Sequence, residues 1–347
     1  MKSLTLRILN GLWLAAIVMA TPNSFASSSP VYTLTKSIPL GAPDRWDYLT
    51  YDAHAHRVYV AHGDHLTVVD ANSGSIIGQV TGMPGGTHGI GIASALNRGL
   101  TDDGHAGTVA LFDSNSLELI KTLPAAPDAD GIAPDQFSGH FFVIDGDSGI
   151  VTVVDPKSET VVANITVGGK LEFGVADNHG KLYVNGAEKK EIIRIDTATN
   201  RVDARWPVPN CTSPHGMAID AASHRLFSSC VNNVLVVVDT RTGATVASVP
   251  IGSGTDAAAF DSRRKLIFSS NGRDGTLTVI KEKNANTYTV VATIKTAVTA
   301  RTMALDPDTG RIFLVAADID HNASSPNGRP VVMPGSLKLL VMSPAQF

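Results

Sequence analysis

The sequence predicts an all-β fold, a closed seven-bladed β-propeller whose blades are four-stranded antiparallel sheets. The first observation is a repeat, because short β-branched runs end at positions 70, 113, 155, 196, 239 and 281, a period of 41 to 43 residues. The second is that each period has room for four short strands, with Gly, Asn and Asp between them and almost no helical periodicity. The third is that the two chain ends supply the strands that complete a seventh blade.

The first 26 residues are typical of a secretory signal peptide. Lys2 and Arg7 precede an apolar run, Ile8 to Ala20, and Ser24-Phe25-Ala26 is a suitable cleavage tripeptide. The run is about half as long as a bilayer span requires, and no later stretch approaches one. We therefore expect an exported chain, periplasmic or secreted, in which residues 27–347 form a single propeller domain and a monomer.

Within each repeat, the opening strand is expected to end at a turn acid, which Ala93 replaces in repeat two. The other turn acids are Asp52, Asp135, Asp177, Asp220, Asp261 and Asp306. Second strands are expected at Val58–Ala61, Phe141–Ile144, Leu182–Val184, Leu226–Ser229, Leu266–Ser269 and Ile312–Val315, with Gly99–Thr101 as a weaker copy. Third strands are expected at Leu66–Asp70, Val109–Asp113, Val151–Asp155, Ile192–Asp196, Leu235–Asp239 and Leu277–Lys281. Fourth strands follow, as at Val161–Val167 and Thr245–Ile251.

The chain ends predict closure of the ring. Val31–Leu40 reads as a fourth strand with no blade before it, and Leu337–Val341 as a third strand with no fourth behind it. Pairing the two leaves no open sheet edge. An open β-solenoid would need polar capping repeats, which the sequence lacks. A long connection in the last blade, residues 316–335, is rich in Asn, Ser, Gly and Pro, and is either a lid or binding loop or a surface excursion.

Several strand sequences resemble the YVTN repeat of periplasmic, YncE-like seven-bladed propellers. The resemblance is carried by Tyr59-Val60-Ala61-His62, Tyr183-Val184-Asn185, Phe268-Ser269-Ser270-Asn271-Gly272, Pro214 to Asp220 and Ala300 to Asp306. It covers nearly all of residues 27–347 and implies the fold and an export compartment, but not an activity, because propellers host many unrelated functions. Repeat two departs from the pattern at Ala93 and Gly99.

The positions five residues before the turn positions should line the mouth of the central channel. They are Asp47, His88, Asp130, Glu172, His215, Asp256 and Arg301. All seven are ionisable, and with histidine neutral they carry a net charge of −3. Because converging buried charges must be paired or bound, we expect a cation, a donor-rich polar ligand or a water network to offset this charge. We call these seven residues the mouth ring.

The favoured function is binding of a small polar ligand or a divalent cation by the mouth ring. Carboxylates and imidazoles from different blades suit a divalent metal, for which His88, His215 and Asp130 are the candidate ligands. The sequence has no short-range ligand motif such as His-Glu-x-x-His to support a metal. A solvated channel rim, with Arg301 paired to an acid, is the purely structural interpretation.

Two other functions stay open. An enzyme of the lyase, isomerase or lactone hydrolase type would use His215 as general acid or base, Asp256 or Glu172 to orient it, and Arg301 to hold an anionic group. A scaffold would bind a partner protein or, as the YncE resemblance implies, single-stranded DNA. Nucleic acid is disfavoured, because the formal net charge is −4 and the basic clusters are small.

The two cysteines are expected to form a disulfide, because an exported chain folds in an oxidising compartment. A turn at Ala221 and Ala222 would pair the flanking strands with residue numbers summing to about 443 by hairpin register. Cys211 and Cys230 sum to 441. They should therefore lie nearly opposite each other at the channel mouth and stiffen the segment that carries His215.

Overall fold

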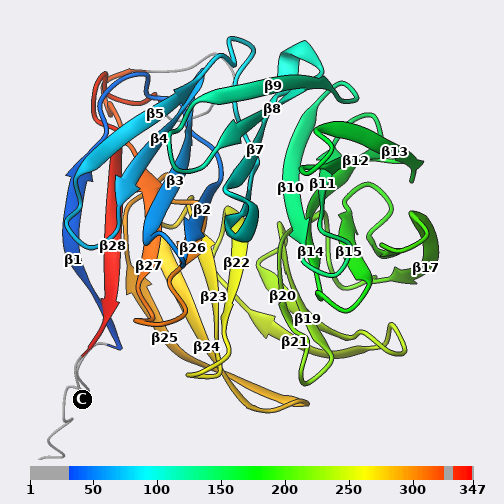
Figure 1. The fold of residues 1–347 in the computed structure, drawn as a ribbon. Coiled ribbons are helices and arrows are strands. Elements are labelled where there is room, and N and C mark those ends of the chain that lie inside the picture. Colours follow the sequence, from blue (N-terminus) through cyan, green and yellow to red (C-terminus); the bar gives the residue numbers. More distant parts are fainter. Residues whose placement is uncertain (1–30, 324–330, 346–347) are drawn as a thin grey trace, which may run out of the picture.

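The computed structural model describes residues 31–323 and 331–345 as seven four-stranded antiparallel sheets arranged in a ring (Figure 1). This architecture confirms the predicted seven-bladed propeller. Residues 1–26, predicted as a signal peptide, lie outside the described residues. Within the described residues, no helix is long and apolar enough to cross a membrane.

Each blade consists of consecutive strands, apart from the last, which the N-terminal strand completes. Blades one to three comprise β2 (Leu49–Asp52), β3 (Arg57–His62), β4 (His65–Asp70) and β5 (Ile76–Thr81); β6 (Ile90–Ala93), β7 (Arg98–Asp103), β8 (Thr108–Asp113) and β9 (Leu119–Pro124); and β10 (Ala129–Asp135), β11 (His140–Asp145), β12 (Ile150–Asp155) and β13 (Thr160–Thr166). Blades four and five comprise β14 (Leu171–Ala176), β15 (Lys181–Gly186), β16 (Glu191–Asp196) and β17 (Arg201–Pro207); and β18 (Pro214–Asp220), β19 (Arg225–Cys230), β20 (Val234–Asp239) and β21 (Thr245–Pro250). Blades six and seven comprise β22 (Thr255–Asp261), β23 (Leu266–Asn271), β24 (Thr276–Asn284) and β25 (Thr287–Lys295); and β26 (Met303–Leu305), β27 (Ile312–Ala316), β28 (Lys338–Pro344) and β1 (Tyr32–Pro39).

The central strands of each blade are buried on both faces, because neighbouring blades cover them. Every residue of β19 is buried, whereas the outermost strand β17 alternates between exposed and half-buried side chains. The hydrophobic core is accordingly divided into clusters between adjacent blades. One of these clusters packs Tyr59 of blade one against Phe112 of blade two, with ring centroids 6.0 Å apart. A Cβ atom at Gly99 would lie 2.1 Å from the Phe112 ring, which explains the glycine in this strand.

The repeated aspartates hold the turns on one face of the propeller. Asp261 accepts hydrogen bonds from the backbone N–H groups of Arg263 and Arg264, at 3.0 and 2.9 Å, as expected of an aspartate that opens a turn. Ala93 cannot do this, and repeat two instead continues into a short 3-10 turn, Ser94–Leu96. Asn97 ends that turn with a φ of 51°, a conformation that asparagine tolerates well.

The ring closes through the pairing of β1 with β28, as the sequence predicts. Ile38 pairs with Leu339 in this antiparallel ladder, and the blue and red strands lie side by side in Figure 1. Tyr32, which is 1% exposed, donates a hydrogen bond from its hydroxyl to the carbonyl of Gly310, at 2.9 Å. Its ring contacts Phe268 of blade six edge-on, with centroids 5.4 Å apart. The first strand therefore also anchors the last blade to its neighbour.

The long connection of the last blade is partly ordered against the start of blade one. Ile319 and Val332 form an isolated antiparallel bridge within it, while residues 324–330 lie outside the described residues. The Asp44 carboxylate accepts hydrogen bonds from the backbone N–H groups of Gly335 and Leu337, at 2.5 and 3.0 Å. These contacts place the end of the connection beside the chain segment that leads into the mouth ring.

Replacing Tyr32 should measure how much the closure contributes to stability. We expect Tyr32→Ala to lower the free energy of unfolding by about 3–5 kcal/mol, through the lost burial and the cavity left behind. Tyr32→Phe, which loses only the hydrogen bond, should cost about 1 kcal/mol. Urea unfolding followed by tryptophan fluorescence measures both. Leu34→Ala, at a 54% exposed position of the same strand, is the control; equal effects of Tyr32→Ala and Leu34→Ala would contradict the closure role.

A candidate binding site at the mouth of the central channel

The structure places all seven residues of the mouth ring at one end of the innermost strands. Four ring residues are the second residues of their strands: Asp130 of β10, Glu172 of β14, His215 of β18 and Asp256 of β22. The other three, Asp47, His88 and Arg301, just precede β2, β6 and β26. The seven are close enough to influence one another electrostatically across the channel, as the charges of Asp47 and Glu172 both act on Asp130. The ring positions thus converge on one axis.

A β-bulge lies at four of these positions and explains how the side chains are directed. The strand register shifts between Ala129 and Gly131, so Asp130 is the extra residue of its strand. Asp256 occupies the same place in β22, and register shifts also span Glu172 and His215. A bulge re-aims a side chain relative to the regular alternation of the strand. The repeated bulges therefore give these residues a common orientation that strand periodicity alone does not provide.

Arg301 neutralises one side of the mouth ring. Its Nε donates to Asp256 Oδ2 at 2.7 Å, and its NH2 group lies 3.3 Å from Asp47 Oδ2. The guanidinium also donates to the carbonyl of Trp46 and lies 5.6 Å from the centre of the Trp46 ring. Although burial disfavours the charged form, the carboxylates outweigh it and raise the pKa of Arg301. Arg301 thus joins blades six, seven and one by a permanent positive charge.

His88 forms a pair with Asp102 that the sequence analysis did not identify. Asp102 is completely buried, and its Oδ1 accepts the backbone N–H groups of His88 and Gly89, at 2.8 and 2.7 Å. Its Oδ2 lies 2.7 Å from Nδ1 of His88, so the imidazole donates from that nitrogen and leaves Nε2 free. Burial alone would lower the pKa of His88, but the hydrogen bond and charge of Asp102 outweigh burial and raise it.

His215 lies beside Glu172 on the other side of the channel. Its Nδ1 is 3.0 Å from the carbonyl oxygen of Ser213 and therefore carries the proton of the neutral ring. Nε2 is left 3.9 Å from Glu172 Oε1. Burial raises the pKa of Glu172, and the charge of His215 opposes this. Asp256, a second predicted orienting acid for His215, pairs with Arg301 instead. The four residues predicted for catalysis thus form two separate pairs, His215 with Glu172 and Arg301 with Asp256.

Asp130 is left without a hydrogen-bonding or ionic partner among the described side chains. Burial raises its pKa well above the usual range, and the neighbouring charges of Asp47, Glu172, Asp102 and Asp256 raise it further. The nearby Tyr48 is 7% exposed, and its hydroxyl makes no hydrogen bond within the described residues. Burial raises the pKa of Tyr48, and the charges of Asp130 and other ring acids raise it further, so Tyr48 lies close to these acids. The ring therefore has a paired side and an unpaired, acidic side.

Two aromatic residues close the channel below the mouth ring. Tyr48 of blade one contacts Phe173 of blade four, with ring centroids 5.0 Å apart. Because these blades are not neighbours, the contact crosses the channel. Beyond it lies a cavity of only about 30 Å³, lined by residues of several blades including Ile90 and Met303. That volume holds about one water molecule. Tyr48 and Phe173 therefore narrow the channel just below the mouth ring and form the floor of a recess there.

A sequence signal for this aromatic pair existed. Tyr48 and Phe173 each follow a ring residue directly, and the other five residues that follow a ring residue are small: Gly89, Gly131, Gly216, Ala257 and Thr302. A Cβ atom at Gly216 would lie 2.5 Å from the backbone of Ala257, which shows how closely the inner strands approach one another. Two large residues among five small ones at equivalent positions indicate that the channel has room for two rings only.

The structure does not assemble the predicted metal ligands. Among residues 31–323 and 331–345, no group of three or more His, Cys, Asp or Glu side chains is arranged to hold a metal ion. The reason is positional, because His88 and His215 belong to blades two and five, which lie roughly opposite each other. Each imidazole also has its own partner, Asp102 and Ser213 respectively. A metal bound by His88, His215 and Asp130 therefore stays a prediction.

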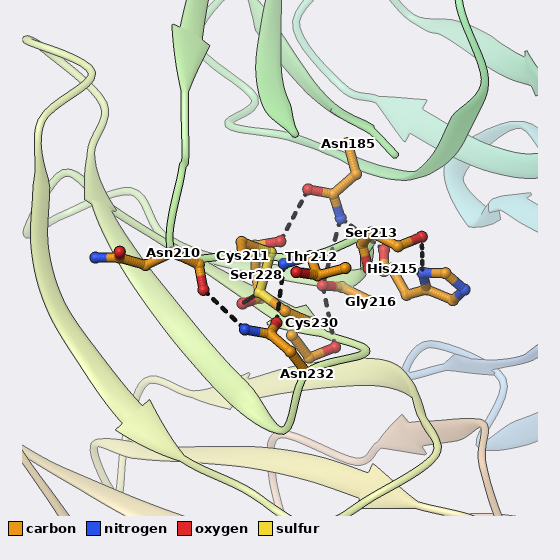
Figure 2. The surroundings of a disulfide bond; sticks show 11 residues. Asn185, Asn210, Cys211, Thr212, Ser213, His215, Gly216, Ser228, Cys230 and Asn232 are labelled. Carbon is orange, nitrogen blue, oxygen red and sulfur yellow. Dashed lines mark hydrogen bonds between the residues drawn. A yellow bond between two sulfur atoms is a disulfide. The ribbon is translucent and has the colours of Figure 1, made fainter. Parts of the chain in front are cut away.

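The predicted disulfide between Cys211 and Cys230 is present, with Cα atoms 5.3 Å apart (Figure 2). The pairing register of β18 and β19 differs from the predicted one. Residues of β18 and β19 pair with numbers summing to 445 beyond the bulge, and it is Pro214 that pairs with Cys230. Cys211 lies in the preceding loop, where its N–H bonds to the carbonyl of Val208 at 2.9 Å. The disulfide therefore ties a loop to a strand end.

The disulfide lies next to the backbone that holds His215. Asn185 donates from Nδ2 to the carbonyl of His215 at 2.6 Å and accepts a hydrogen bond from Ser228 at 2.9 Å (Figure 2). On the other side, Asn232 connects the two halves of the loop by accepting from Thr212 N–H at 2.8 Å. The imidazole points away from the disulfide (Figure 2). The His215 backbone is thus held from both flanks while its ring remains directed at the channel.

Comparison with known proteins supports the fold and nothing finer. No family model and no curated protein matches the chain. A chain of "Crystal Structure of Mitotic Checkpoint Complex" superposes with a TM-score of 0.75 at 15% identity, covering 99% of this chain and 100% of that one. "Kuenenia stuttgartiensis Hydrazine Synthase" superposes with a TM-score of 0.68 at 12% identity, covering 83% of this chain and 94% of that one. Identities this low show a shared propeller architecture alone.

The pKa of His88 should depend on the charge of Asp102. We expect it above the ordinary value of about 6.5, and lower in Asp102→Asn, where only the charge of Asp47 still opposes burial. Because the folded-state pKa of His88 is raised, protonated His88 contributes stability that is fully present below pH ~6.5 and is lost as pH rises through the folded pKa. NMR titration of the imidazole measures the shift, with Asp147→Asn as the control. An unchanged pKa in Asp102→Asn would exclude the coupling.

Removal of the disulfide should loosen blade five without unfolding the ring. For Cys211→Ala with Cys230→Ala, we expect a loss of about 2–4 kcal/mol in the free energy of unfolding, since the closed loop is short. Hydrogen exchange of the His215 and Gly216 amides should accelerate, whereas amides of blade two should not. Urea unfolding and exchange mass spectrometry measure the two effects. Unchanged exchange at His215 would show that Asn185 alone holds that segment.

Proposed function

We propose that this propeller binds a small polar ligand in the recess formed by the mouth ring, and that the ligand presents a positive charge or several hydrogen-bond donors. The observation that carries the proposal is the carboxylate of Asp130, which pairs with no described side chain and lies close enough to Tyr48 for its charge to raise the pKa of that phenol. Neither group is among the fully enclosed polar atoms that lack a partner, so a ligand that enters the recess can reach both. A ligand with amino or hydroxyl groups would satisfy both.

The arrangement around Asp130 favours an organic ligand over a bare ion. Its carboxylate neighbours are engaged elsewhere, Asp47 and Asp256 with Arg301, and Asp102 with His88. The aromatic pair of Tyr48 and Phe173 provides an apolar surface at the bottom of the recess. Aromatic faces beside carboxylates suit ligands that combine a cationic or donor group with a hydrocarbon part. We therefore place an amine-bearing ligand ahead of a divalent cation.

We also propose that the chain is an exported member of the YVTN propellers. The disulfide between Cys211 and Cys230 supports an oxidising compartment, because such bonds are rare in reducing ones. The charged and apolar pattern of residues 1–26 supports export. The strand sequences that resemble the YVTN repeat, such as Tyr183-Val184-Asn185, lie in β15 and equivalent strands. Together they support the periplasm as the location in which the ligand would be met.

The test replaces Asp130 with asparagine and follows binding by calorimetry. We expect 1,4-diaminobutane to bind the wild-type protein, and glycerol and CaCl2 to bind more weakly or not at all. Asp130→Asn should weaken binding of the diamine by at least about tenfold, since a charge-assisted hydrogen bond is lost. It should also raise Tm without ligand, because it removes a repelled carboxylate. Asp308→Asn, an exposed carboxylate on the other face, is the control.

The pH dependence provides an independent check. Because the pKa of Asp130 is raised, a cationic ligand that needs the carboxylate form should bind more weakly as pH falls below that raised value, and should displace a proton on binding. Equal diamine affinity in wild type and Asp130→Asn would refute the proposed role of Asp130. Tighter binding of CaCl2 than of the diamine would instead revive the cation hypothesis.

A further inference from the structure

A cavity that is separate from the mouth ring lies on the opposite face of the propeller. It has a volume of about 710 Å³ and lies among the turns of blades one to four. Its residues come from the far ends of the inner strands, such as Asp135, whereas Asp130 lies near the start of the same strand. Five residues of strand span roughly 16 Å, so the cavity and the recess are separate sites.

The irregular turn of repeat two accounts for this cavity. Ala93 replaces the turn acid of the other repeats, and the 3-10 turn that follows contributes the small Ala95 to the lining. Small side chains here leave space that the flanking turns of blades one and three do not fill. The departure from the repeat pattern thus coincides with a cavity on the turn face.

The lining combines an apolar wall with unpaired basic groups. Ile92, Leu96 and Phe141 contribute apolar surface, while His54, His140 and Lys157 contribute nitrogen atoms. Nδ1 of His140 is buried and has no hydrogen-bond partner within the described residues.

The acid in the lining does not balance these bases. Asp135 is buried and already accepts hydrogen bonds from Ser138, at 3.1 Å from the backbone and 2.8 Å from the hydroxyl. The side chains of His54 and Lys157 form no ion pair with any described residue, and only the backbone N–H of each is hydrogen bonded. The cavity therefore offers hydrogen-bond donors and the positive charge of Lys157, whereas Asp135, the acid in its lining, is already engaged.

We propose that this cavity is a second binding site, for an organic anion with an apolar body, such as an aromatic carboxylate or sulfonate. Its volume lies within the range of about 300–1,000 Å³ that is typical of small-molecule pockets. The apolar part would contact Phe141 and Ile92, and the anionic group would be held by Lys157 and His140. The site does not depend on the mouth ring, whose acids attract ligands of the opposite charge.

Two fluorescent dyes that differ by one sulfonate group provide the test. 8-Anilinonaphthalene-1-sulfonate is the anionic probe, and N-phenyl-1-naphthylamine has the same rings without the charge. We expect saturable 1:1 binding of the sulfonate dye to the full-length protein, tighter than that of the neutral dye. Lys157→Glu should weaken binding of the sulfonate dye by at least about tenfold and leave the affinity for the neutral dye nearly unchanged. Lys189→Glu, an equal charge change at an exposed position away from the cavity, should alter neither.

A second variant locates the probe independently of charge. Ala95 is exposed at the edge of the cavity, so Ala95→Trp should fill the cavity without disturbing the fold, as circular dichroism can verify. We expect it to abolish binding of both dyes. Retained binding of the sulfonate dye in Ala95→Trp would overturn the site. Loss of both dyes in Ala95→Trp combined with no effect of Lys157→Glu would overturn the anion class.

Discussion

The convergence of seven inner strands on one axis is the constraint on which the rest of this structure depends. At the level of the axis, adjacent strands approach so closely that the backbone of Ala257 would collide with a side chain at Gly216. Only a few large side chains can enter this space, and polar ones that enter it must find partners there. This crowding explains the glycines beside ring residues, such as Gly216, the presence of only one aromatic pair among the described residues at the axis, and the ion pairs of Arg301.

Charge is distributed unevenly around this axis. Arg301 compensates two acids on the side of blades six, seven and one, and His88 compensates Asp102 on blade two. On blade four, Glu172 has His215 at 3.9 Å and Lys170 at 4.0 Å, whereas Asp130 of blade three has no such partner among the described side chains. The asymmetry makes one side of the recess receptive to a positively charged group.

The sequence predicts the fold well because its information is periodic. The recurring acids at positions such as Asp261 hold turns in the structure, and counting back from them locates the mouth ring. Pairing inside the ring could not be predicted in the same way. Whether Asp256 approaches His215 or Arg301 depends on bulges and on contacts between blades, which spacing along one strand does not encode. The cavity on the turn face could not be predicted for a related reason. The sequence shows that Ala93 departs from the repeat, but it does not show that a cavity results.

The junction of β1 and β28 joins parts of the chain that are far apart in sequence, as the hydrogen bond from Thr35 to Val341 spans 306 residues. Until the final strand is available, β27 presents an unpaired edge and Tyr32 has no site in which to bury its ring. Such distant contacts form slowly compared with local hairpins. A partly synthesised or truncated chain therefore presents an unpaired, aggregation-prone sheet edge. Protection by a chaperone during that interval would matter more for this molecule than for an open repeat array, which has no such final step.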